Sequence, residues 1–311
     1  MRRAWMLFAT MTLVAGVTLL AGTAQAETPG VNGRITFGRF NDDIGDFDIF
    51  TANPDGSDMT EVLPGPAECP RWSADGTQIL VCVEDDGLVR PAIMDADGSG
   101  LSVVPVADPT LNLGCWAWSG SGRLACEAWD DAHPNRAPGV FVLRSSDGGG
   151  LHRVTTNSVG SHDVPGDFAP GGGRIVFGRG ADPNTESGTL YVVGADGTGL
   201  HRITPRGFAE DNGSWSPDGR WIVFSSTRAK LFVVHPDGTG MQRIPIANRG
   251  GPAYAFQPTW SPDGTRILAD VFLASSGELH LFTMAADGTD PQVVEGTHGG
   301  DEFSDWGVDT G

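Results

Sequence analysis

The chain has 311 residues and a formal net charge of −19, with 39 acidic residues against 20 lysines and arginines. This composition argues against nucleic acid or another polyanion as a partner, because phosphate recognition draws on clustered Lys and Arg, and Lys230 is the single lysine. It is typical of a solvated, soluble protein, which we expect to be a monomer that attracts cations or basic partners.

The first 26 residues are predicted to be a secretory signal peptide. Arg2 and Arg3 precede an apolar run that ends near Leu20, and Ala24-Gln25-Ala26 supplies the small residues of a cleavage site. An uncleaved membrane anchor is the alternative, because the run is close to spanning length. Cleavage before Glu27 would change the net charge from −19 to −21. We therefore expect residues 27–311 to reach the periplasm, cell envelope or medium, without membrane insertion after cleavage.

One aromatic motif, usually followed by a turn signal, recurs six times along the rest of the chain. Its aromatic residues are Trp72, Trp118, Phe168, Trp215, Trp260 and Trp306. The spacings of 46, 50, 47, 45 and 46 residues predict a propeller. The even repeats leave no room for a second domain, so residues 27–311 are expected to form a single six-bladed propeller domain.

Each repeat carries signals for four strands. The pentad at residues 215–219 ends one strand and begins the next, because Pro presets a turn dihedral and Gly accepts positive φ. Apolar runs such as 222–224 and 231–234 suit the second and third strands, and an Asp-Gly hairpin signal ends the third. A fourth follows, as at 200–204. The predicted fold class is therefore all-β, with four-stranded antiparallel blades that cover one another by radial stacking.

The two ends of the chain are predicted to complete one blade together. Asn32-Gly33 and Ile35-Thr36-Phe37 match the turn and second strand of a repeat that lacks its first strand. The missing strand is present at residues 303–306. Pairing of the N- and C-terminal strands would close the ring and leave no open edge there.

Four cysteines fit an exported protein. Cys69 and Cys115 both stand three residues before a motif tryptophan, whereas Cys82 and Cys126 lie in the strands after the turns. We predict disulfides within each blade, Cys69 with Cys82 and Cys115 with Cys126, although four cysteines allow three connectivities and free buried thiols are the alternative. No close Cys or His pair suggests a metal centre.

The aromatic-Ser-Pro-Asp-Gly turns, the Ile-Val-Phe strands after them and the Asp-Gly-Thr-Gly turns further on resemble the WD40-like repeat of TolB-type propellers. The resemblance covers residues 31–309. TolB itself carries an α/β domain ahead of its propeller, which we expect this chain to lack because the first blade begins close to the cleavage site. The same repeat forms the propeller of prolyl-oligopeptidase-like peptidases and the scaffold of some pectate-fragment lyases. The peptidases need an α/β-hydrolase domain, and no Gly-x-Ser-x-Gly elbow is present here.

The resemblance implies that the first strand of each blade lines a central channel and that the loop before it forms a rim. Side chains expected in the channel wall include Arg71, Asp167 and Asp305. The rim would carry Glu68, His162, Asp163, Glu210, Asp211, His298, Asp301 and Glu302, with the aromatic residues Trp116, Tyr254 and Phe256 nearby. Such an acidic mouth could hold Ca²⁺ or a basic side chain, and a merely solvated rim is the alternative.

The sequence favours a non-catalytic module that binds or scaffolds a protein or peptide. A rigid frame with variable loops suffices for that role. The alternative is an enzyme, a lyase or hydrolase acting on carbohydrate or peptide, with its centre at the acidic mouth and a His162 or His298 cluster with a nearby carboxylate. No catalytic residue and no required cofactor are predicted.

Overall fold

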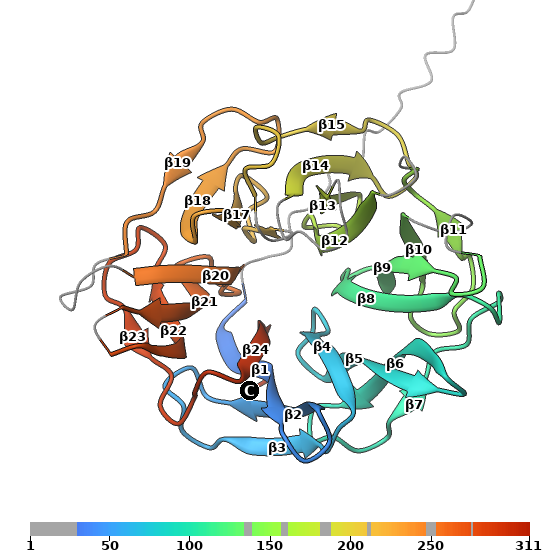
Figure 1. Cartoon of the computed structure of the whole chain (residues 1–311), viewed down its shortest axis with the longest axis horizontal. Coiled ribbons are helices and arrows are strands. Elements are labelled where there is room, and N and C mark those ends of the chain that lie inside the picture. The colour runs from blue at the N-terminus through green and yellow to red at the C-terminus, as the bar shows by residue number, and fades with distance from the viewer. Residues whose placement is uncertain are drawn as a thin grey trace, which may run out of the picture.

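The computed structural model describes residues 30–133, 139–156, 161–180, 188–209, 213–246, 253–274 and 276–311. This part of the chain forms six four-stranded antiparallel sheets arranged around a central axis (Figure 1). The predicted all-β, six-bladed propeller is confirmed. Across the same ranges, no helix has the length and hydropathy needed to cross a membrane.

The blades are numbered I to VI in chain order, and each is given from its innermost strand outward. Blade I comprises β24 (Asp301–Val308), β1 (Asn32–Asn41), β2 (Asp46–Ala52) and β3 (Thr60–Leu63). Blade II comprises β4 (Ala67–Trp72), β5 (Gln78–Asp85), β6 (Leu88–Asp95) and β7 (Ser102–Val103). Blade III comprises β8 (Asn112–Trp118), β9 (Arg123–Trp129), β10 (Val140–Arg144) and β11 (His152–Arg153).

The second half of the ring repeats this order. Blade IV comprises β12 (His162–Phe168), β13 (Arg174–Gly180), β14 (Gly188–Gly194) and β15 (His201–Arg202). Blade V comprises β16 (Ser214–Trp215), β17 (Ile222–Ser226), β18 (Lys230–Val234) and β19 (Gln242–Arg243). Blade VI comprises β20 (Ala253–Trp260), β21 (Arg266–Leu273), β22 (Glu278–Ala285) and β23 (Gln292–Val293).

Blade I contains both ends of the described chain, as predicted. Strand β24 pairs antiparallel with β1, so that Ile35 lies opposite Trp306. The Trp306 indole Nε1 donates a hydrogen bond to the Gly33 carbonyl at 3.1 Å. The ring is thus closed by pairing between strands from the two ends of the sequence, with the earliest and latest colours side by side in Figure 1.

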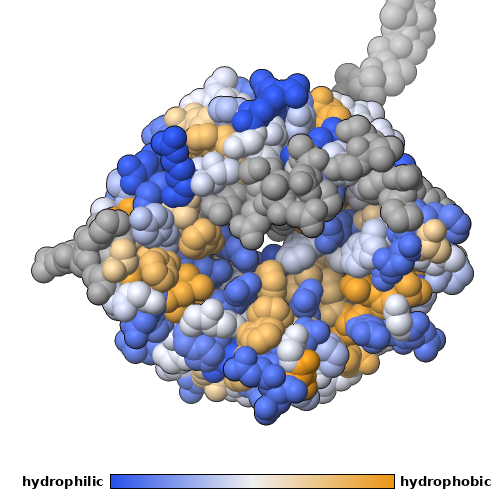
Figure 2. Space-filling model, in the orientation of Figure 1, coloured by the Kyte–Doolittle hydropathy of each residue, from blue (hydrophilic) through white to orange (hydrophobic). Residues whose placement is uncertain are grey.

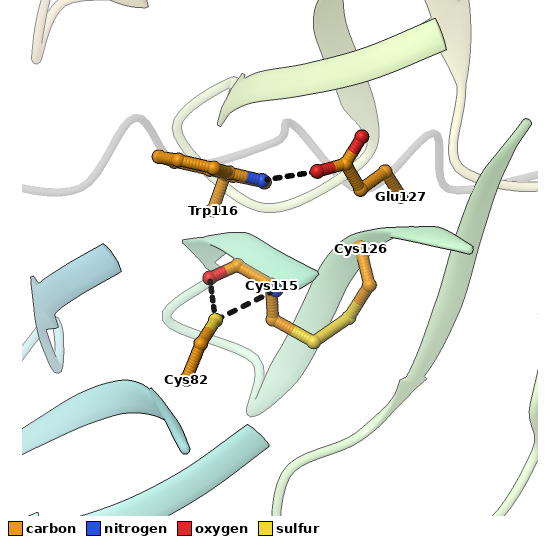
Figure 3. Close-up of a disulfide and its surroundings, with 5 residues drawn as sticks. All are labelled: Cys82, Cys115, Trp116, Cys126 and Glu127. Carbon is orange, nitrogen blue, oxygen red and sulfur yellow. Dashed lines mark hydrogen bonds between the residues drawn. A yellow bond between two sulfur atoms is a disulfide. The ribbon is translucent and has the colours of Figure 1, made fainter. Parts of the chain in front are cut away.

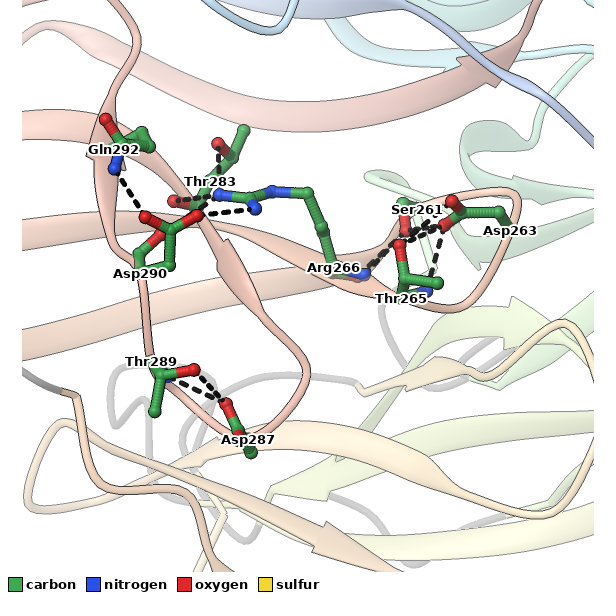
Figure 4. A network of polar contacts seen from close by, with 9 residues as sticks. All are labelled: Ser261, Asp263, Thr265, Arg266, Thr283, Asp287, Thr289, Asp290 and Gln292. Atoms are coloured by element: carbon green, nitrogen blue, oxygen red, sulfur yellow. Dashed lines mark hydrogen bonds and ion pairs between the residues drawn. The ribbon is translucent and has the colours of Figure 1, made fainter.

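Side chains within each turn explain the recurrent Ser-Pro-Asp-Gly and Asp-Gly-Thr signals (Figure 4). The Ser261 hydroxyl donates to the Asp263 carboxylate at 2.7 Å, and the Thr265 backbone N–H donates to the same carboxylate at 2.9 Å. In the other turn of the blade, Asp287 accepts both the backbone N–H and the hydroxyl of Thr289. Burial opposes the shift, but the hydrogen bonds from Thr265 and Ser261 lower the pKa of Asp263, and those from Thr289 lower the pKa of Asp287. These short-range bonds select the turn conformation locally.

The glycine of the Asp-Gly turn also fits each blade against the one before it. Gly288 of blade VI has φ +83°, and a Cβ there would collide with the Pro245 carbonyl of blade V. Gly98 of blade II, with φ +85°, meets Val62 of blade I in the same way. Glycine is therefore required at these turns both for its backbone conformation and for close packing between blades.

The apolar core is divided into the interfaces between neighbouring blades. Phe37 and Ile35 of β1 are fully buried and pack with Leu268 and Leu281 of blade VI. Both lie on one face of β1 because side chains alternate along a strand. Phe177 and Phe224 are buried at the same position of their blades. Each second strand thus holds its blade to a neighbour.

One of the two predicted disulfides is wrong. Cys115 and Cys126 form a disulfide, and these residues lie directly opposite each other on β8 and β9 (Figure 3). Cys69 and Cys82 are both buried free cysteines. In blade II the residue directly opposite Cys82 is Glu68, and the backbone bulges at Cys69, where φ is +59°.

The turn lengths explain why the two cysteine pairs differ. Trp72 pairs with Ile79, seven residues on, whereas Trp118 pairs with Leu124, six residues on. Cys82 therefore falls at the strand position that Glu127 occupies in blade III, one residue beyond the position of Cys126. The two thiols are nevertheless in contact without a bond, since burial, followed by a hydrogen bond with the Cys82 thiol, raises the pKa of Cys69. The Cys82 sulfur also accepts the backbone N–H of Cys115 at 3.2 Å (Figure 3).

Candidate functional site

A channel of about 1090 Å³ runs through the centre of the ring, and the first strands of the blades line it. The space-filling view shows the central opening, with apolar surface beside it (Figure 2). The residue before each motif aromatic faces this space: Arg71, Ala117, Asp167, Ser214, Thr259 and Asp305 all belong to the lining. The sequence therefore placed Arg71, Asp167 and Asp305 correctly in the channel wall.

Asp167 and Asp305 tie neighbouring blades together. The Asp305 carboxylate accepts the backbone N–H of Trp72 in blade II at 2.8 Å. The Asp167 carboxylate accepts the backbone N–H of Trp215 in blade V at 2.9 Å and, at 3.3 Å, the Ser214 hydroxyl. Each aspartate thus satisfies a partly buried donor across a blade boundary, which gives both residues a structural role.

The environment of Asp167 also changes its acidity. Burial raises the pKa of Asp167 to about 7, the hydrogen bond from Trp215 opposes the rise, and the negative charge of Asp305 adds to it. Asp167 consequently titrates near neutral pH at the centre of the ring. A perturbed carboxyl in a channel is also a recognised sign of a functional position.

Arg71 crosses the channel wall between three blades. Its guanidinium donates to the Trp116 carbonyl of blade III at 2.9 Å and to the Phe303 carbonyl of blade I at 2.9 Å. It also lies 5.8 Å from the centroid of the Trp116 ring. Arg71 therefore fixes the backbone that carries two aromatic side chains of the channel.

The rim aspartates Asp163 and Asp301 are buried in ion pairs. Arg179 donates two hydrogen bonds to Asp163, both at 2.6 Å, and Arg39 donates to Asp301 at 2.7 and 2.9 Å. Both aspartate side chains have no exposed surface. Their charges are neutralised inside blades IV and I, so they do not add free carboxylates to the mouth.

The two rim histidines take separate positions. His298 donates its backbone N–H to Asp301 at 2.8 Å, and its Nδ1 accepts from Gly300 at 3.4 Å. His162 belongs to blade IV, and its Nδ1 is buried with no hydrogen-bond partner among the described residues. The structure therefore does not bring the two histidines together.

The remaining predicted residues divide into four groups. Trp116, Phe256 and Glu302 line the channel. Tyr254 is outside the lining and lies under Lys230, whose Nζ is 4.3 Å from its ring centroid. Glu210 and Asp211 lie outside the described residues. Glu68 lies on β4, the first strand of blade II, and its side chain is exposed.

Aromatic side chains of blades I and III form a continuous row at the mouth where the first strands begin. The ring of Phe303 lies 5.1 Å from that of Phe47 and 5.6 Å from that of Trp116, and Phe47 lies 5.3 Å from Phe40. Phe40 is 41% exposed, and its neighbour in the β1–β2 turn, Ile44, is 47% exposed. The row is therefore an apolar surface that begins in the channel and reaches the outside of the ring.

Four carboxylates surround this row, and we call Asp46, Glu68, Glu127 and Glu302 the mouth acids. Burial, followed by the charges of Asp46 and Glu302, raises the pKa of Glu68. Burial raises the pKa of Glu127 to about 7, opposed by a hydrogen bond from Trp116 and reinforced by the charge of Glu68 (Figure 3). The mouth acids thus repel one another, and a cation placed among them would relieve that repulsion.

The backbone near the mouth is held in an uncommon conformation. Cys69, Gln257 and Phe303 stand three residues before their motif tryptophans, and all have positive φ, at 59°, 45° and 60°. Gln257 accepts the Phe303 backbone N–H across the boundary of blades VI and I at 3.1 Å. Positive φ in residues other than glycine is uncommon and concentrates at functional sites.

In the described ranges, no three His, Cys, Asp or Glu side chains lie close enough together to hold a metal ion.

The sequence analysis did not predict Glu127, Phe47 and Phe303 as residues of the mouth. One signal for Glu127 was present, because Gly114 lies opposite it and leaves room for its side chain.

No protein-family model and no curated protein matches the sequence. The chain is similar in structure to TolB from Acinetobacter baumannii, with a TM-score of 0.66 and 18% identity over 88% of this chain and 66% of that one. It therefore spans slightly less than two thirds of that TolB chain. A putative TolB from Agrobacterium tumefaciens gives a TM-score of 0.60 and 19% identity, covering 88% and 90%.

An oligogalacturonate lyase from Vibrio parahaemolyticus shares the fold at a TM-score of 0.54 and 12% identity, covering 80% of this chain and 71% of the lyase. At identities this low, the similarities establish the fold alone. They support a TolB-type propeller scaffold, and the same scaffold occurs in a protein described as an enzyme.

Proposed function

We propose that the chain is an exported propeller that binds a protein or peptide partner at the mouth of its channel. The observation that carries this proposal is the aromatic row of Phe40, Phe47, Phe303 and Trp116. Aromatic side chains supply most of the binding energy in many protein interfaces. Here they are mounted on rigid strands at one opening of the ring.

Affinity capture tests the binding role. The mature protein would be incubated with cell-envelope and culture fractions, and captured proteins identified by mass spectrometry. We expect a specific partner that is lost with the double substitution Phe40→Ser and Phe303→Ser. Tyr254→Ser is the matched control, because Tyr254 is a partly exposed aromatic outside the channel lining. A partner retained by the double variant would contradict binding at the mouth.

Export is supported by the leader-like residues 1–26 and by the disulfide between Cys115 and Cys126. The mature chain is proposed to begin at Glu27 and to be a monomer. Intact-mass measurement of protein recovered outside the cytoplasm should give the mass of a chain that begins at Glu27. Light scattering should give the molar mass of a single chain. A chain that retains Met1 would contradict cleavage.

Acid–base chemistry on a carbohydrate or peptide is a second candidate, favoured by one observation. Asp167 has a pKa of about 7 and lies in the channel within the field of Asp305. A carboxyl that titrates near neutral pH suits a general acid or base. If the channel were such a centre, Asp167→Asn would abolish turnover of oligogalacturonate or of a peptide library, whereas a binding module would show no turnover before or after the change.

A further inference from the structure

We propose that the partner segment inserts an arginine or lysine side chain among the mouth acids and lays an adjacent apolar side chain on the aromatic row. This inference rests on the proposed binding function and adds the chemistry of the ligand. It concerns Asp46, Glu68, Glu127 and Glu302 together with Phe303 and Trp116.

Charge is the first argument. The mouth acids come from three blades, and the charges of three of them raise the pKa of a neighbour, Asp46 and Glu302 acting on Glu68 and Glu68 acting on Glu127. The nearby cation, Arg71, donates to the carbonyls of Pro70, Trp116 and Phe303. Within the described part of the chain, neither Asp46 nor Glu68 forms a salt bridge. A guanidinium or ammonium group from outside would supply the missing charge.

Ser304 provides an independent sign of a ligand. It is 4% exposed, it belongs to the channel lining, and its hydroxyl has no hydrogen-bond partner in the described structure. It directly follows Glu302 and Phe303 on β24. A buried hydroxyl without a partner is costly unless a further group approaches it, and the N–H groups of a bound arginine are such donors.

The aromatic row selects a peptide rather than a small cation. Phe303 and Trp116 flank the channel edge, whereas Phe40 and Ile44 extend the apolar surface outward. A single ammonium ion would leave this surface uncovered, but a segment with a basic residue beside an apolar one would cover it. Arginine also stacks on aromatic faces, as Arg71 does on Trp116 at 5.8 Å.

Calorimetry with two matched peptides tests the inference. The probes are acetyl-Gly-Trp-Arg-Gly-amide and the same peptide with citrulline, which keeps the shape of arginine and removes its charge. We expect the citrulline peptide to bind at least about tenfold more weakly, the change in Kd that corresponds to about 1.4 kcal/mol. The double variant Glu68→Gln and Glu302→Gln should bind both peptides equally, and added salt should weaken only the arginine peptide.

Glu61→Gln is the matched control, because Glu61 is exposed on the outermost strand of blade I. Equal binding of the two peptides to the unmodified protein, unchanged discrimination in the double variant, or absence of binding by either peptide would each overturn the inference. A captured partner that needs Phe40 and Phe303 but tolerates the double glutamine variant would leave the proposed function standing and remove the basic residue from it.

Discussion

Blades I and IV lie opposite each other in the ring and share their buried polar residues, but they differ at the mouth. Asp301 with Arg39 in blade I repeats Asp163 with Arg179 in blade IV. Asp305 and Asp167 likewise make the same bond to the next blade. Between these aspartates, blade I has Glu302-Phe303-Ser304, whereas blade IV has Val164-Pro165-Gly166.

The comparison separates two kinds of acidic residue that look alike in sequence. Residues that recur in both blades hold the propeller together. Residues of blade I without a counterpart in blade IV, above all Glu302 and Phe303, contribute to the mouth instead. Between blades I and IV, a carboxylate near the channel is therefore a candidate for binding where its counterpart is absent, as Glu302 is.

Removal of the arginine that neutralises a buried aspartate should give the largest loss of stability. Arg179→Ala leaves the carboxylate of Asp163 buried without a counter-charge, and the expected cost is about 3 kcal/mol. The melting temperature should fall by roughly 6 °C or more. Arg39→Ala should lower it by a similar amount. Arg220→Ala, at a side chain that is 79% exposed, is the control. Unequal losses from the two blades would break the comparison.

Blades II and III extend the comparison to the cysteines. Because Cys115 and Cys126 are bonded and Cys69 and Cys82 are free, thiol titration of the denatured, unreduced protein should give two thiols. Reduction should cost about 2–3 kcal/mol, the value expected for a short loop, and this should appear as a lower Tm. A count of zero would show that Cys69 and Cys82 are also bonded, and a count of four would show that Cys115 and Cys126 are not.

Loss of either channel aspartate should have a smaller effect. Asp167→Ala and Asp305→Ala each leave a tryptophan backbone N–H without its acceptor, at a cost of about 1–3 kcal/mol by chemical denaturation. Asp167→Asn keeps an acceptor for Trp215 and should lose much less. If the alanine and asparagine variants are equally stable, the hydrogen bond across the blade boundary contributes nothing.

The dependence of stability on pH should identify Asp167 and Glu127. Their pKa values of about 7 in the folded protein exceed the unfolded values near 4. Folding therefore takes up protons between about pH 4 and about pH 7. The contribution of these two carboxyls to the free energy of unfolding is fully present below about pH 4 and is lost as the pH rises through about 7. Asp167→Asn should reduce the fall in stability between pH 5 and pH 8 by about 1 kcal/mol, allowing for partial screening.

Exposed aspartates of the turns have the opposite effect at lower pH. Hydrogen bonds lower the pKa of Asp97 and Asp237, so their contribution is present above the unfolded pKa and is lost as pH falls through the folded pKa. Melting temperatures measured from pH 3 to pH 9 should consequently show a maximum in the mildly acidic range. A Tm that rises steadily from pH 5 to pH 9 would contradict the raised pKa values.

Glu302→Val should have the smallest effect on stability, within about 0.5 kcal/mol, because the change copies blade IV at a partly exposed position. The same change is expected to weaken binding of a partner captured at the mouth. Val164→Glu is the reciprocal substitution and should not create binding in blade IV, which lacks the aromatic row.

Sequence periodicity was sufficient for the fold, because the turn signals act locally and recur six times. It also placed Arg71, Asp167 and Asp305 in the channel. It did not show that Asp163 and Asp301 are neutralised, since the partners Arg179 and Arg39 lie on the adjacent strand. It also did not show that only Cys115 and Cys126 are bonded, because one residue of turn length decides which residue lies directly opposite the second cysteine.

The final strand determines when the mouth comes into being. Asp301–Val308 supplies Glu302, Phe303 and Ser304 and pairs with β1, which is made almost at the start of the described chain. During synthesis, five blades have all their strands before this segment emerges, yet the ring is still open and the aromatic row lacks Phe303. A nascent or C-terminally clipped chain would therefore contain most of the scaffold but an incomplete recognition surface.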